Sequence, residues 1–237
     1  MREERFTITE NAPLRPDVFR LRLAGNCEAV TAPGQFVSLS VPGLFLRRPF
    51  SVCDREGDML TLVYQVKGRG TGALSRMQSG TLDVLTGLGN GFDLSRAGDA
   101  PVLCAGGLGF TPLYFLAKAL PKKPRVVLGF ATAAEVLYAD EFRALGCDVK
   151  LCTADGSAGE KGLVPDFLGN ASYFYACGSE GMLRALEREA ACEGEFSLEA
   201  RMGCGFGACM GCTRETVSGP KRVCRDGPVF RKGEILW

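Results

Sequence analysis

Four cysteines near the C-terminus constrain this chain more than any other feature. They follow the spacing Cys204-x4-Cys209-x2-Cys212-x11-Cys224. Three thiols on one short loop and a fourth from a later segment can surround a rhombic two-iron core, and this spacing is typical of plant-type [2Fe–2S] sites. Glycines beside the ligands let backbone N–H groups approach the sulfur atoms (Gly203, Gly205, Gly207 and Gly211). The spacing therefore predicts an iron–sulfur cluster held by these four thiolates.

The absence of histidine limits the alternatives. The chain has 11 cysteines and no histidine, which excludes zinc sites with imidazole ligands, Rieske centres, His-ligated haem and His-dependent catalytic triads. A zinc site with four thiolate ligands remains an alternative, although such sites usually contain two C-x2-C pairs. Chemistry here must use thiols, carboxylates, backbone dipoles or a bound cofactor, and we predict no catalytic side chain.

The other seven cysteines are scattered along the chain. Cys177 ends a predicted strand beside Gly178, at a sheet edge where doubly wound folds bind ligands, so both core packing and a role in a site stay open for it. The odd number of cysteines argues against a disulfide scaffold, and the first residues hold no apolar signal segment, so we expect a cytoplasmic protein. We interpret the remaining six as small buried hydrophobes: Cys27, Cys53, Cys104, Cys147, Cys152 and Cys192.

The 237 residues divide into three parts by their patterns. Residues 1–97 contain short runs, several with period-two alternation, separated by Gly and Pro turns, which predicts a six-stranded antiparallel barrel. Residues 98–192 form a predicted α/β domain, and residues 193–237 a turn-rich cluster-binding module. The predicted barrel strands are Arg5–Thr9, Val18–Leu23, Gln35–Val41, Phe50–Asp54, Met59–Val66 and Leu82–Thr86.

Strands and helices alternate at short spacing in the α/β part, which predicts a parallel sheet with helices on both faces. The weakly charged run Ala100–Ala117 contains three glycines and Pro112, so we interpret it as a strand, a turn and a helix start rather than a membrane span. The predicted strands are Pro101–Ala105, Arg125–Phe130, Asp148–Thr153 and Tyr173–Cys177. The predicted helices are Pro112–Leu120, Ala133–Leu145, Leu163–Leu168 and Glu180–Cys192.

A glycine-rich loop, Gly106-Gly107-Leu108-Gly109-Phe110-Thr111-Pro112, joins the first strand and helix of this domain. A pyrophosphate could approach its N–H groups, and we expect Thr111 to cap the helix and Pro112 to take its first position. The third glycine of the dinucleotide fingerprint is absent, and no acidic residue ends the second strand. A tight structural turn is the alternative, but a second glycine-rich turn, Asp155–Gly159, follows the third strand at the same edge and favours a nucleotide.

The barrel part contains Arg47-Arg48-Pro49-Phe50-Ser51 at the start of a predicted strand. Arg48 could pair with a phosphate, and Ser51 could donate a hydrogen bond to a ring nitrogen. Gly70-Thr71 opens a predicted helical stretch over residues 72–77 and could cradle another phosphate. A solvated arginine beside an ordinary loop is the alternative.

Together these motifs resemble those of the ferredoxin-reductase-like flavoproteins. In that family an R-P-x-S barrel motif binds a flavin and a G-G-x-G-x-x-P loop binds a pyridine nucleotide. A C-G-S/P-x-x-M-L segment, here Cys177–Leu183, faces the nicotinamide. Over essentially its full length the chain is similar to the electron-transfer subunits of NAD-dependent class 1B dihydroorotate dehydrogenases, through Leu88–Phe92, Asp155–Ser157, Lys161-Gly162, Cys204–Cys212 and Val223–Phe230.

The resemblance implies FAD, a [2Fe–2S] cluster and NAD(H) as cofactors. Two departures are visible: Thr111 stands where many relatives have Ala, and Gln65 stands where Arg is frequent, so position 65 supplies no charge for the flavin phosphates. The implied flavin-binding residues are Arg48, Pro49, Phe50, Ser51, Val63, Tyr64, Gln65, Gly70 and Thr71. The implied nucleotide-binding residues are Gly106, Gly107, Gly109, Thr111, Pro112, Cys177 and Gly178.

The implied function is electron transfer in pyrimidine biosynthesis. A nicotinamide exchanges a hydride and an iron–sulfur cluster a single electron, so a flavin has to lie between them. The family oxidises dihydroorotate on a separate FMN-containing TIM-barrel subunit, and we expect that partner here in a heterotetramer of two plus two. Alternatives are an NAD(P)H–ferredoxin or sulfide-dehydrogenase-type reductase subunit, and a zinc-bearing structural or regulatory module.

The charge balance bears on other partners. Lys and Arg number 28 and Asp and Glu 27, a net charge of +1, so there is no electrostatic case for nucleic acid or an anionic membrane. No arginine cluster for a 2′-phosphate occurs at Ala131–Glu135 or Thr153–Ser157. We therefore favour NAD over NADP.

Overall fold

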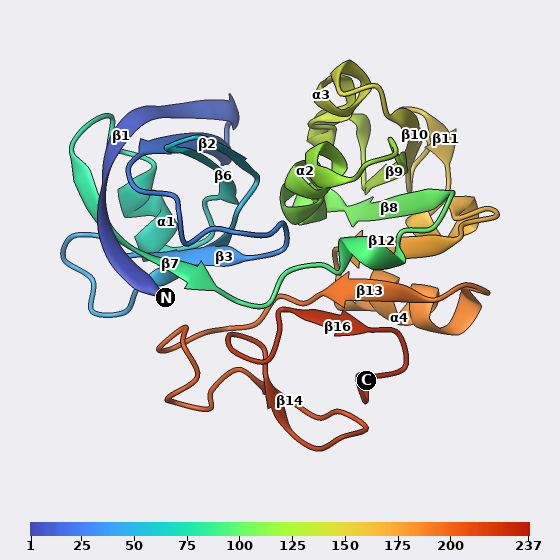
Figure 1. Ribbon diagram of the computed structural model, residues 1–237. Coiled ribbons are helices and arrows are strands. Elements are labelled where there is room, and N and C mark those ends of the chain that lie inside the picture. Colours follow the sequence, from blue (N-terminus) through green and yellow to red (C-terminus); the bar gives the residue numbers. More distant parts are fainter.

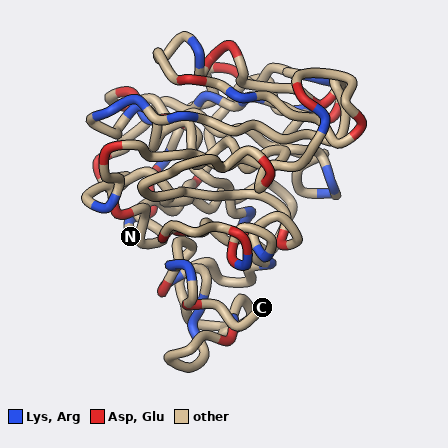
Figure 2. Tube along the Cα trace, turned by 90° about the vertical axis from the view of Figure 1, so that its right-hand side faces the viewer, with Lys and Arg blue, Asp and Glu red and all other residues tan.

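The computed structural model describes residues 1–237. Two seven-stranded sheets lie side by side, and a loop-rich C-terminal segment projects below them (Figure 1). Basic and acidic positions are interleaved over the body of the molecule (Figure 2). No helix is long and apolar enough to cross a membrane.

The first sheet is antiparallel throughout, in the order β4-β3-β7-β1-β2-β6-β5. Buried residues alternate with more accessible ones, as in β7, where Leu82, Val84 and Leu88 are buried. Its strands are β1 (Arg2–Arg15), β2 (Val18–Ala24), β3 (Phe36–Leu39), β4 (Arg48–Ser51), β5 (Asp54–Glu56), β6 (Met59–Gln65) and β7 (Thr81–Leu88), with helix α1 (Arg69–Leu74) between β6 and β7.

The barrel has seven strands rather than the predicted six, because the predicted strand Phe50–Asp54 is divided. Its first half belongs to β4, which pairs with β3 at one edge of the sheet, and β5 pairs with β6 at the other edge. Between them, the Val52 N–H donates to the Gln35 carbonyl and the Cys53 N–H donates to the Thr61 carbonyl. This short buried crossing joins the two sheet edges and closes the barrel.

The second sheet has the order β11-β10-β9-β8-β12-β13-β16 and is parallel except for β16, which confirms the predicted parallel sheet. Its strands are β8 (Pro101–Gly106), β9 (Arg125–Phe130), β10 (Asp148–Thr153), β11 (Glu160–Lys161), β12 (Tyr173–Cys177), β13 (Gly194–Ser197) and β16 (Val229–Arg231). The helices are α2 (Phe110–Ala119), α3 (Ala139–Ala144) and α4 (Glu180–Glu189).

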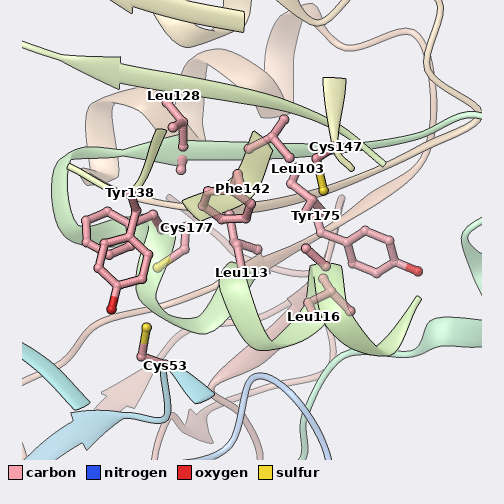
Figure 3. Packing of buried hydrophobic residues seen from close by; sticks show 14 of the residues in the cluster. Cys53, Leu103, Leu113, Leu116, Leu128, Tyr138, Phe142, Cys147, Tyr175 and Cys177 are labelled. Carbon is pink, nitrogen blue, oxygen red and sulfur yellow. The ribbon is translucent and has the colours of Figure 1, made fainter. Parts of the chain in front are cut away.

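Helices cover both faces of this sheet, as predicted. Alternate strand residues point to opposite sides: Leu103, Leu128 and Tyr175 share a core with α2 and α3 (Figure 3). Their chain neighbours Cys104 and Phe174 share the other core with α4. Continuous apolar strands of this kind are typical of a parallel sheet buried on both faces.

The C-terminal segment is not separate from this sheet. Strands β13 and β16 both lie beyond residue 192, so the sheet takes two strands from the predicted cluster-binding module. A two-stranded hairpin, β14 (Thr213–Arg214) with β15 (Lys221–Arg222), is the only other sheet in the module. The division at residues 97/98 and 192/193 stays a prediction.

Four helix predictions were wrong in their extent. The stretch predicted over residues 72–77 is helix α1, so Gly70 and Thr71 lie inside the helix rather than before it, and the predicted helix Glu180–Cys192 ends at Glu189. The predicted helix Ala133–Leu145 is a 3₁₀ turn, Ala133–Glu135, followed by α3. Tyr138 interrupts it with φ of 63°, because its ring is held between Phe110 and Tyr114, at centroid distances of 4.4 and 5.2 Å. The predicted helix Leu163–Leu168 is a 3₁₀ turn over Val164–Phe167.

The start of α2 also differs from the prediction. A 3₁₀ turn, Gly107–Gly109, leads into the helix, and Gly109 takes the N-cap position without a side-chain cap. Thr111 therefore does not cap the helix, and Pro112 takes its third position rather than its first. Proline is tolerated there because N–H groups of the first turn have no partner inside the helix.

The barrel and the parallel sheet share a core, which sets the two walls of the site relative to each other. Val18 and Cys53 of the barrel belong to the cluster that surrounds Tyr138, whose hydroxyl points toward the Cys53 thiol (Figure 3). Lys118 of α2 reaches across to Asp54 and Glu56 of β5, at 2.6 and 2.8 Å.

All eleven cysteines are free thiols. Five of the six predicted packing cysteines are buried, and Cys192 is half-buried.

Candidate functional site

A cleft of about 530 Å³ separates the barrel from the parallel sheet. One wall is β4 and β6 of the barrel, and the other consists of loops that follow β8, β9, β12 and β13. These loops lie at the carboxyl ends of parallel strands, where open α/β sheets bind ligands.

The barrel wall contains most of the predicted flavin-binding residues. Pro49, Phe50 and Ser51 of β4 and Val63, Tyr64 and Gln65 of β6 all line the cleft. The Phe50 and Tyr64 rings meet edge to face at 5.6 Å. Burial raises the pKa of Tyr64 to about 12, and its hydroxyl donates to Asn11 Oδ1 at 3.0 Å. This wall therefore offers an anchored aromatic surface with one hydroxyl, on Ser51, beside it.

Arg48, Gly70 and Thr71 lie together but do not line the cleft. A Cβ atom on Gly70 would lie 2.3 Å from Arg48 Nε, so the guanidinium packs directly against the glycine. Thr71 Oγ1 accepts hydrogen bonds from the N–H groups of Lys67 and Gly68 and so caps its own helix. The structure thus brings Arg48 and Gly70 together, as a group beside the cleft.

Two basic residues of the barrel wall were missed by the sequence analysis, Arg15 and Lys67. The Asp17 carboxylate accepts from Gln65 Nε2 at 2.6 Å and from Arg15 Nε at 2.9 Å. The hydrogen bond from Gln65, together with the Arg15 charge, lowers the pKa of Asp17. Gln65 has no charge of its own, but it helps hold the carboxylate that orients Arg15. Only pairing of the β1–β2 hairpin with β6 reveals this connection.

The wall on the parallel sheet is formed largely by glycines, as predicted. Gly106, Gly107, Gly109 and Gly178 line the cleft, and so does the buried Thr111. A Cβ atom on Gly109 would lie 2.0 Å from the carbonyl oxygen of the residue that ends β12, so the loop needs glycine at this point. Close contact between backbone segments therefore shapes this wall.

Pro112 and Cys177 do not line the cleft. Both are buried, and Cys177 is only 2% exposed. Burial raises the pKa of the Cys177 thiol. These two residues form the layer behind the glycines rather than the surface of the cleft.

A third stretch of wall was not predicted. The segment from Ser197, the last residue of β13, to Met202 lines the cleft with all of its residues except Arg201. The alternation of polar and apolar residues in Glu195-Phe196-Ser197 is the sequence signal for β13, but it is too short to stand out among the surrounding turn-forming residues. Met202 lies two residues before Cys204, so one chain segment connects the cleft to the cysteines.

The four predicted ligand cysteines lie as two pairs. The Cys204 N–H donates to Cys209 Sγ at 3.5 Å, and the Cys224 N–H donates to Cys212 Sγ at 3.4 Å. No three Cys, Asp or Glu side chains in the chain converge as the ligands of a single metal ion do. Two pairs of thiols are the ligand set that a two-iron rhomb requires.

Backbone N–H groups surround the first of these sulfur atoms. The N–H groups of Phe206, Ala208 and Cys209 donate to Cys204 Sγ at 3.5, 3.2 and 3.5 Å. Burial opposes ionisation of Cys204, but the backbone donors outweigh it and lower its pKa to about 6. Burial and the nearby Cys212 raise the pKa of Cys224 to about 12. The loop thus presents donors to a thiolate, as an anionic cluster requires.

Sequence comparisons place this site among known proteins. A family model described as the iron-sulfur cluster binding domain of dihydroorotate dehydrogenase B matches residues 199–236. A protein from Geobacillus sp. (strain WCH70), named the electron transfer subunit of dihydroorotate dehydrogenase B (NAD(+)), is 41% identical over 256 residues, covering 100% of this chain and 99% of the relative. A protein of the same name from Bacillus caldolyticus is 42% identical over 253 residues, 98% of each chain.

Solved structures share the arrangement of the two sheets. A chain of the NADH-dependent reduced ferredoxin-NADP oxidoreductase, described for flavin-based electron bifurcation, aligns with a TM-score of 0.87 and 29% identity over 98% of this chain and 90% of its own. A ferredoxin NADP+ reductase from Neisseria gonorrhoeae with bound FAD and NADP aligns with a TM-score of 0.65 and 18% identity, over 80% and 92% of the two chains. The predicted ferredoxin-reductase-like fold is confirmed.

Proposed function

The chain belongs to the family of electron transfer subunits of NAD(+)-dependent dihydroorotate dehydrogenase B, and we propose that its cleft and its cysteine module form one electron path. The observation that carries this proposal is the continuity of the chain. The segment Ser197–Met202 lines the cleft with all of its residues except Arg201, and the first ligand cysteine, Cys204, follows two residues after Met202. Groups bound in the cleft and at the cysteines would therefore lie near each other.

The barrel wall would hold FAD, through Pro49–Ser51, Val63, Tyr64 and Gln65. Bound there, FAD supplies the exchange between a two-electron hydride and single electrons. Phe50 and Tyr64 provide apolar surface for a ring system, and Ser51 provides a donor beside it. Arg48 against Gly70, with the adjacent Thr71, would hold a flavin phosphate. The positive charge missing at Gln65 would come from Arg15 and Lys67.

The opposite wall would bind NAD(H). Gly106, Gly107 and Gly109 lead directly into the ten-residue helix α2, so unpaired N–H groups and the positive end of the helix dipole face an incoming pyrophosphate. Thr111 and Gly178 complete this surface, while Pro112 and Cys177 fix its shape from behind. The protein's task is to bring the nicotinamide against the flavin and to exclude water.

The cysteine module would hold the [2Fe–2S] cluster. Cys204 with Cys209 and Cys212 with Cys224 would each bind one iron. The three N–H donors on Cys204 Sγ would stabilise the added negative charge of the reduced cluster and so raise its reduction potential.

An electron transfer subunit implies a catalytic subunit as its partner, and we propose that this partner carries FMN in a TIM barrel, in a cytoplasmic complex of two plus two chains that serves pyrimidine biosynthesis. Cys209 is exposed at the module surface, between Phe206 and Met210, which are 43% and 51% exposed. Exposed apolar side chains of this kind favour a protein contact beside the cluster.

The test uses the purified single chain with its cofactors. We expect NADH to reduce an artificial acceptor through it, and we expect no orotate from dihydroorotate until the FMN-containing subunit is added. Orotate formation by the single chain would overturn the assignment of dihydroorotate oxidation to the partner. A colourless protein that contains zinc and no iron would overturn the redox function as a whole.

A second candidate is a subunit of an NAD(P)H–ferredoxin reductase, favoured by the TM-score of 0.87 with the NADH-dependent reduced ferredoxin-NADP oxidoreductase. The full-length relatives at about 41% identity favour the dihydroorotate enzyme over it. Reduced ferredoxin distinguishes the two: rapid NAD+ reduction by ferredoxin without the FMN-containing subunit would support the second candidate.

A further inference from the structure

Glu135 is an acidic residue that lines the cleft at the end farthest from the cysteine module. The sheet order β9-β8-β12-β13 places the turn after β9 at one end of the cleft, and the segment that leads to Cys204 at the other. Because the cluster side must accommodate the flavin and the nicotinamide, the far end is where the adenosine of a dinucleotide would lie. Glu135 reaches this end from a 3₁₀ turn five residues beyond Phe130, the last residue of β9.

Hydrogen bonds to the turn after β10 and within its own turn fix the position of Glu135. The Ala133 N–H donates to Ser157 Oγ at 2.7 Å, and Ser157 Oγ donates to Asp155 Oδ1 at 2.6 Å. These bonds tie the turn after β9 to the turn after β10. The Ala131 N–H donates to Glu135 Oε2 at 3.4 Å, a long and weak bond. The half-buried carboxylate is thus positioned, yet it makes no ion pair and keeps acceptor capacity toward the cleft.

The charges around the turns after β9 and β10 are unfavourable for the 2′-phosphate that distinguishes NADP from NAD. Asp155 adds another carboxylate one strand away, and the hydrogen bonds from Ser157 lower its pKa. Lys161 packs its aliphatic carbons against Gly156 in that turn and does not line the cleft. The basic residues that do line the cleft, Arg15 and Lys67, come from the barrel wall opposite.

A carboxylate accepts hydrogen bonds and donates none. It therefore pairs well with the 2′- and 3′-hydroxyl groups of an adenosine ribose, and it repels a 2′-phosphate. We propose that Glu135 selects NAD(H) over NADP(H) by accepting hydrogen bonds from this ribose. The inference rests on the proposed function, since it requires a pyridine dinucleotide along this edge of the sheet.

The test measures binding rather than turnover. NAD+ and NADP+ are titrated by calorimetry into the full chain with flavin and cluster, for the wild type and for Glu135→Gln, Glu135→Asp and Glu141→Gln. Glu141→Gln is the matched control, because it removes the same charge from an exposed position on α3 that does not line the cleft. Retention of flavin absorption reports folding of each variant.

We expect the wild type and Glu141→Gln to bind NAD+ about 100-fold more tightly than NADP+, and Glu135→Gln to reduce that ratio at least about tenfold. Glu135→Asp, which keeps the charge, should keep most of the preference. A ratio in Glu135→Gln within about twofold of the wild type would overturn the inference, even if NAD+ binds well. A wild type that binds neither dinucleotide would overturn the proposed function itself, and this inference with it.

Discussion

The cleft wall on the parallel sheet and the loop that carries the cysteines are held in place by different means. Gly109 lies directly against the backbone that ends β12, and buried Pro112 and Cys177 support it from behind. The cysteine loop has no helix, and the strands next to it in sequence, β14 and β15, are only two residues long. Exposed Phe206 lies at its surface. The wall on the parallel sheet is therefore shaped by the fold itself, whereas we expect the cysteine loop to depend on a bound cluster for its order.

The largest expected effect breaks the cysteine loop and spares the sheet. We expect Cys212→Ser to lose the iron and the visible absorption of the cluster, and to expose the module to trypsin at Arg214, Lys221 and Arg222. Flavin content should stay unchanged. Iron analysis, absorption spectra and limited proteolysis measure these effects, with Cys192→Ser as the control outside the module. A Cys212→Ser protein with full iron content would show that the loop does not need this ligand.

The next largest effect concerns the cleft wall on the parallel sheet. Gly109→Ala would place a Cβ atom 2.0 Å from the carbonyl oxygen of Cys177, so the loop has to move. We expect a loss of stability of about 1–3 kcal/mol and at least about tenfold weaker NAD+ binding. Denaturant unfolding and calorimetry measure the two effects.

Gly181→Ala is the matched control for that substitution, because a Cβ atom there would have no neighbour within 4 Å and the residue lies in α4. It should be neutral or slightly stabilising. If Gly109→Ala and Gly181→Ala changed stability and NAD+ binding equally, backbone contact at Gly109 would not be what shapes this wall.

A smaller, pH-dependent effect concerns Glu195, which is buried on β13 and accepts from the Asp93 N–H at 3.0 Å. Burial raises its pKa from 4.5 to about 7. The hydrogen bond from the Asp93 N–H and the charges of Arg231 and Arg96 oppose the rise, while the negative charge of Asp93 adds to it. The folded chain thus holds this proton between pH 4.5 and 7, where the unfolded chain has lost it. Stability from this group should therefore fall as pH rises through that window.

We expect Glu195→Gln to stabilise the chain by about 1–2 kcal/mol at pH 8 and to have little effect at pH 4. Urea unfolding at both pH values measures the difference. Because β13 ends at the cleft, this result would show that a buried group of the sheet itself sets the stability of that wall, with no ligand involved. An equal effect at both pH values would contradict the role of the buried carboxyl group.

The smallest expected effect concerns the barrel wall. Arg15→Gln removes a positive charge that Asp17 orients at the cleft, and we expect it to weaken flavin retention about three- to tenfold. Arg5→Gln is the control. Arg5 lies on β1, as Arg15 does, and the substitution breaks only an exposed ion pair with Asp83 of β7. Flavin dissociation measured by fluorescence compares the two. Equal retention in both variants would show that Arg15 does not contact the flavin.

The sequence predicted the elements that depend on local pattern. Strands β9, β10 and β12 begin and end at the predicted residues, because each is an apolar run between turn-forming residues. The shared loop of Cys204, Cys209 and Cys212 was found for the same reason, since these three ligands lie within nine consecutive residues. The glycine loop was found because its composition is itself the signal.

The sequence did not predict what depends on contacts between distant segments. The division of Phe50–Asp54 into β4 and β5 follows from barrel closure, and the break at Tyr138 follows from packing against Phe110. Glu135 and Arg15 reach the cleft only because a 3₁₀ turn and a hairpin bring them there. No local pattern carries that information.

Reduction of the cluster by NADH, with and without flavin, tests most directly whether the cleft and the cysteine module form one path. The full chain is mixed with NADH under anaerobic conditions, and cluster absorption and its electron paramagnetic resonance signal are followed over time. We expect the cluster in the flavin-loaded chain to be reduced, and the cluster in the flavin-free chain to stay oxidised. A cluster that is reduced equally fast without flavin, or that stays oxidised in the loaded chain, would contradict the account.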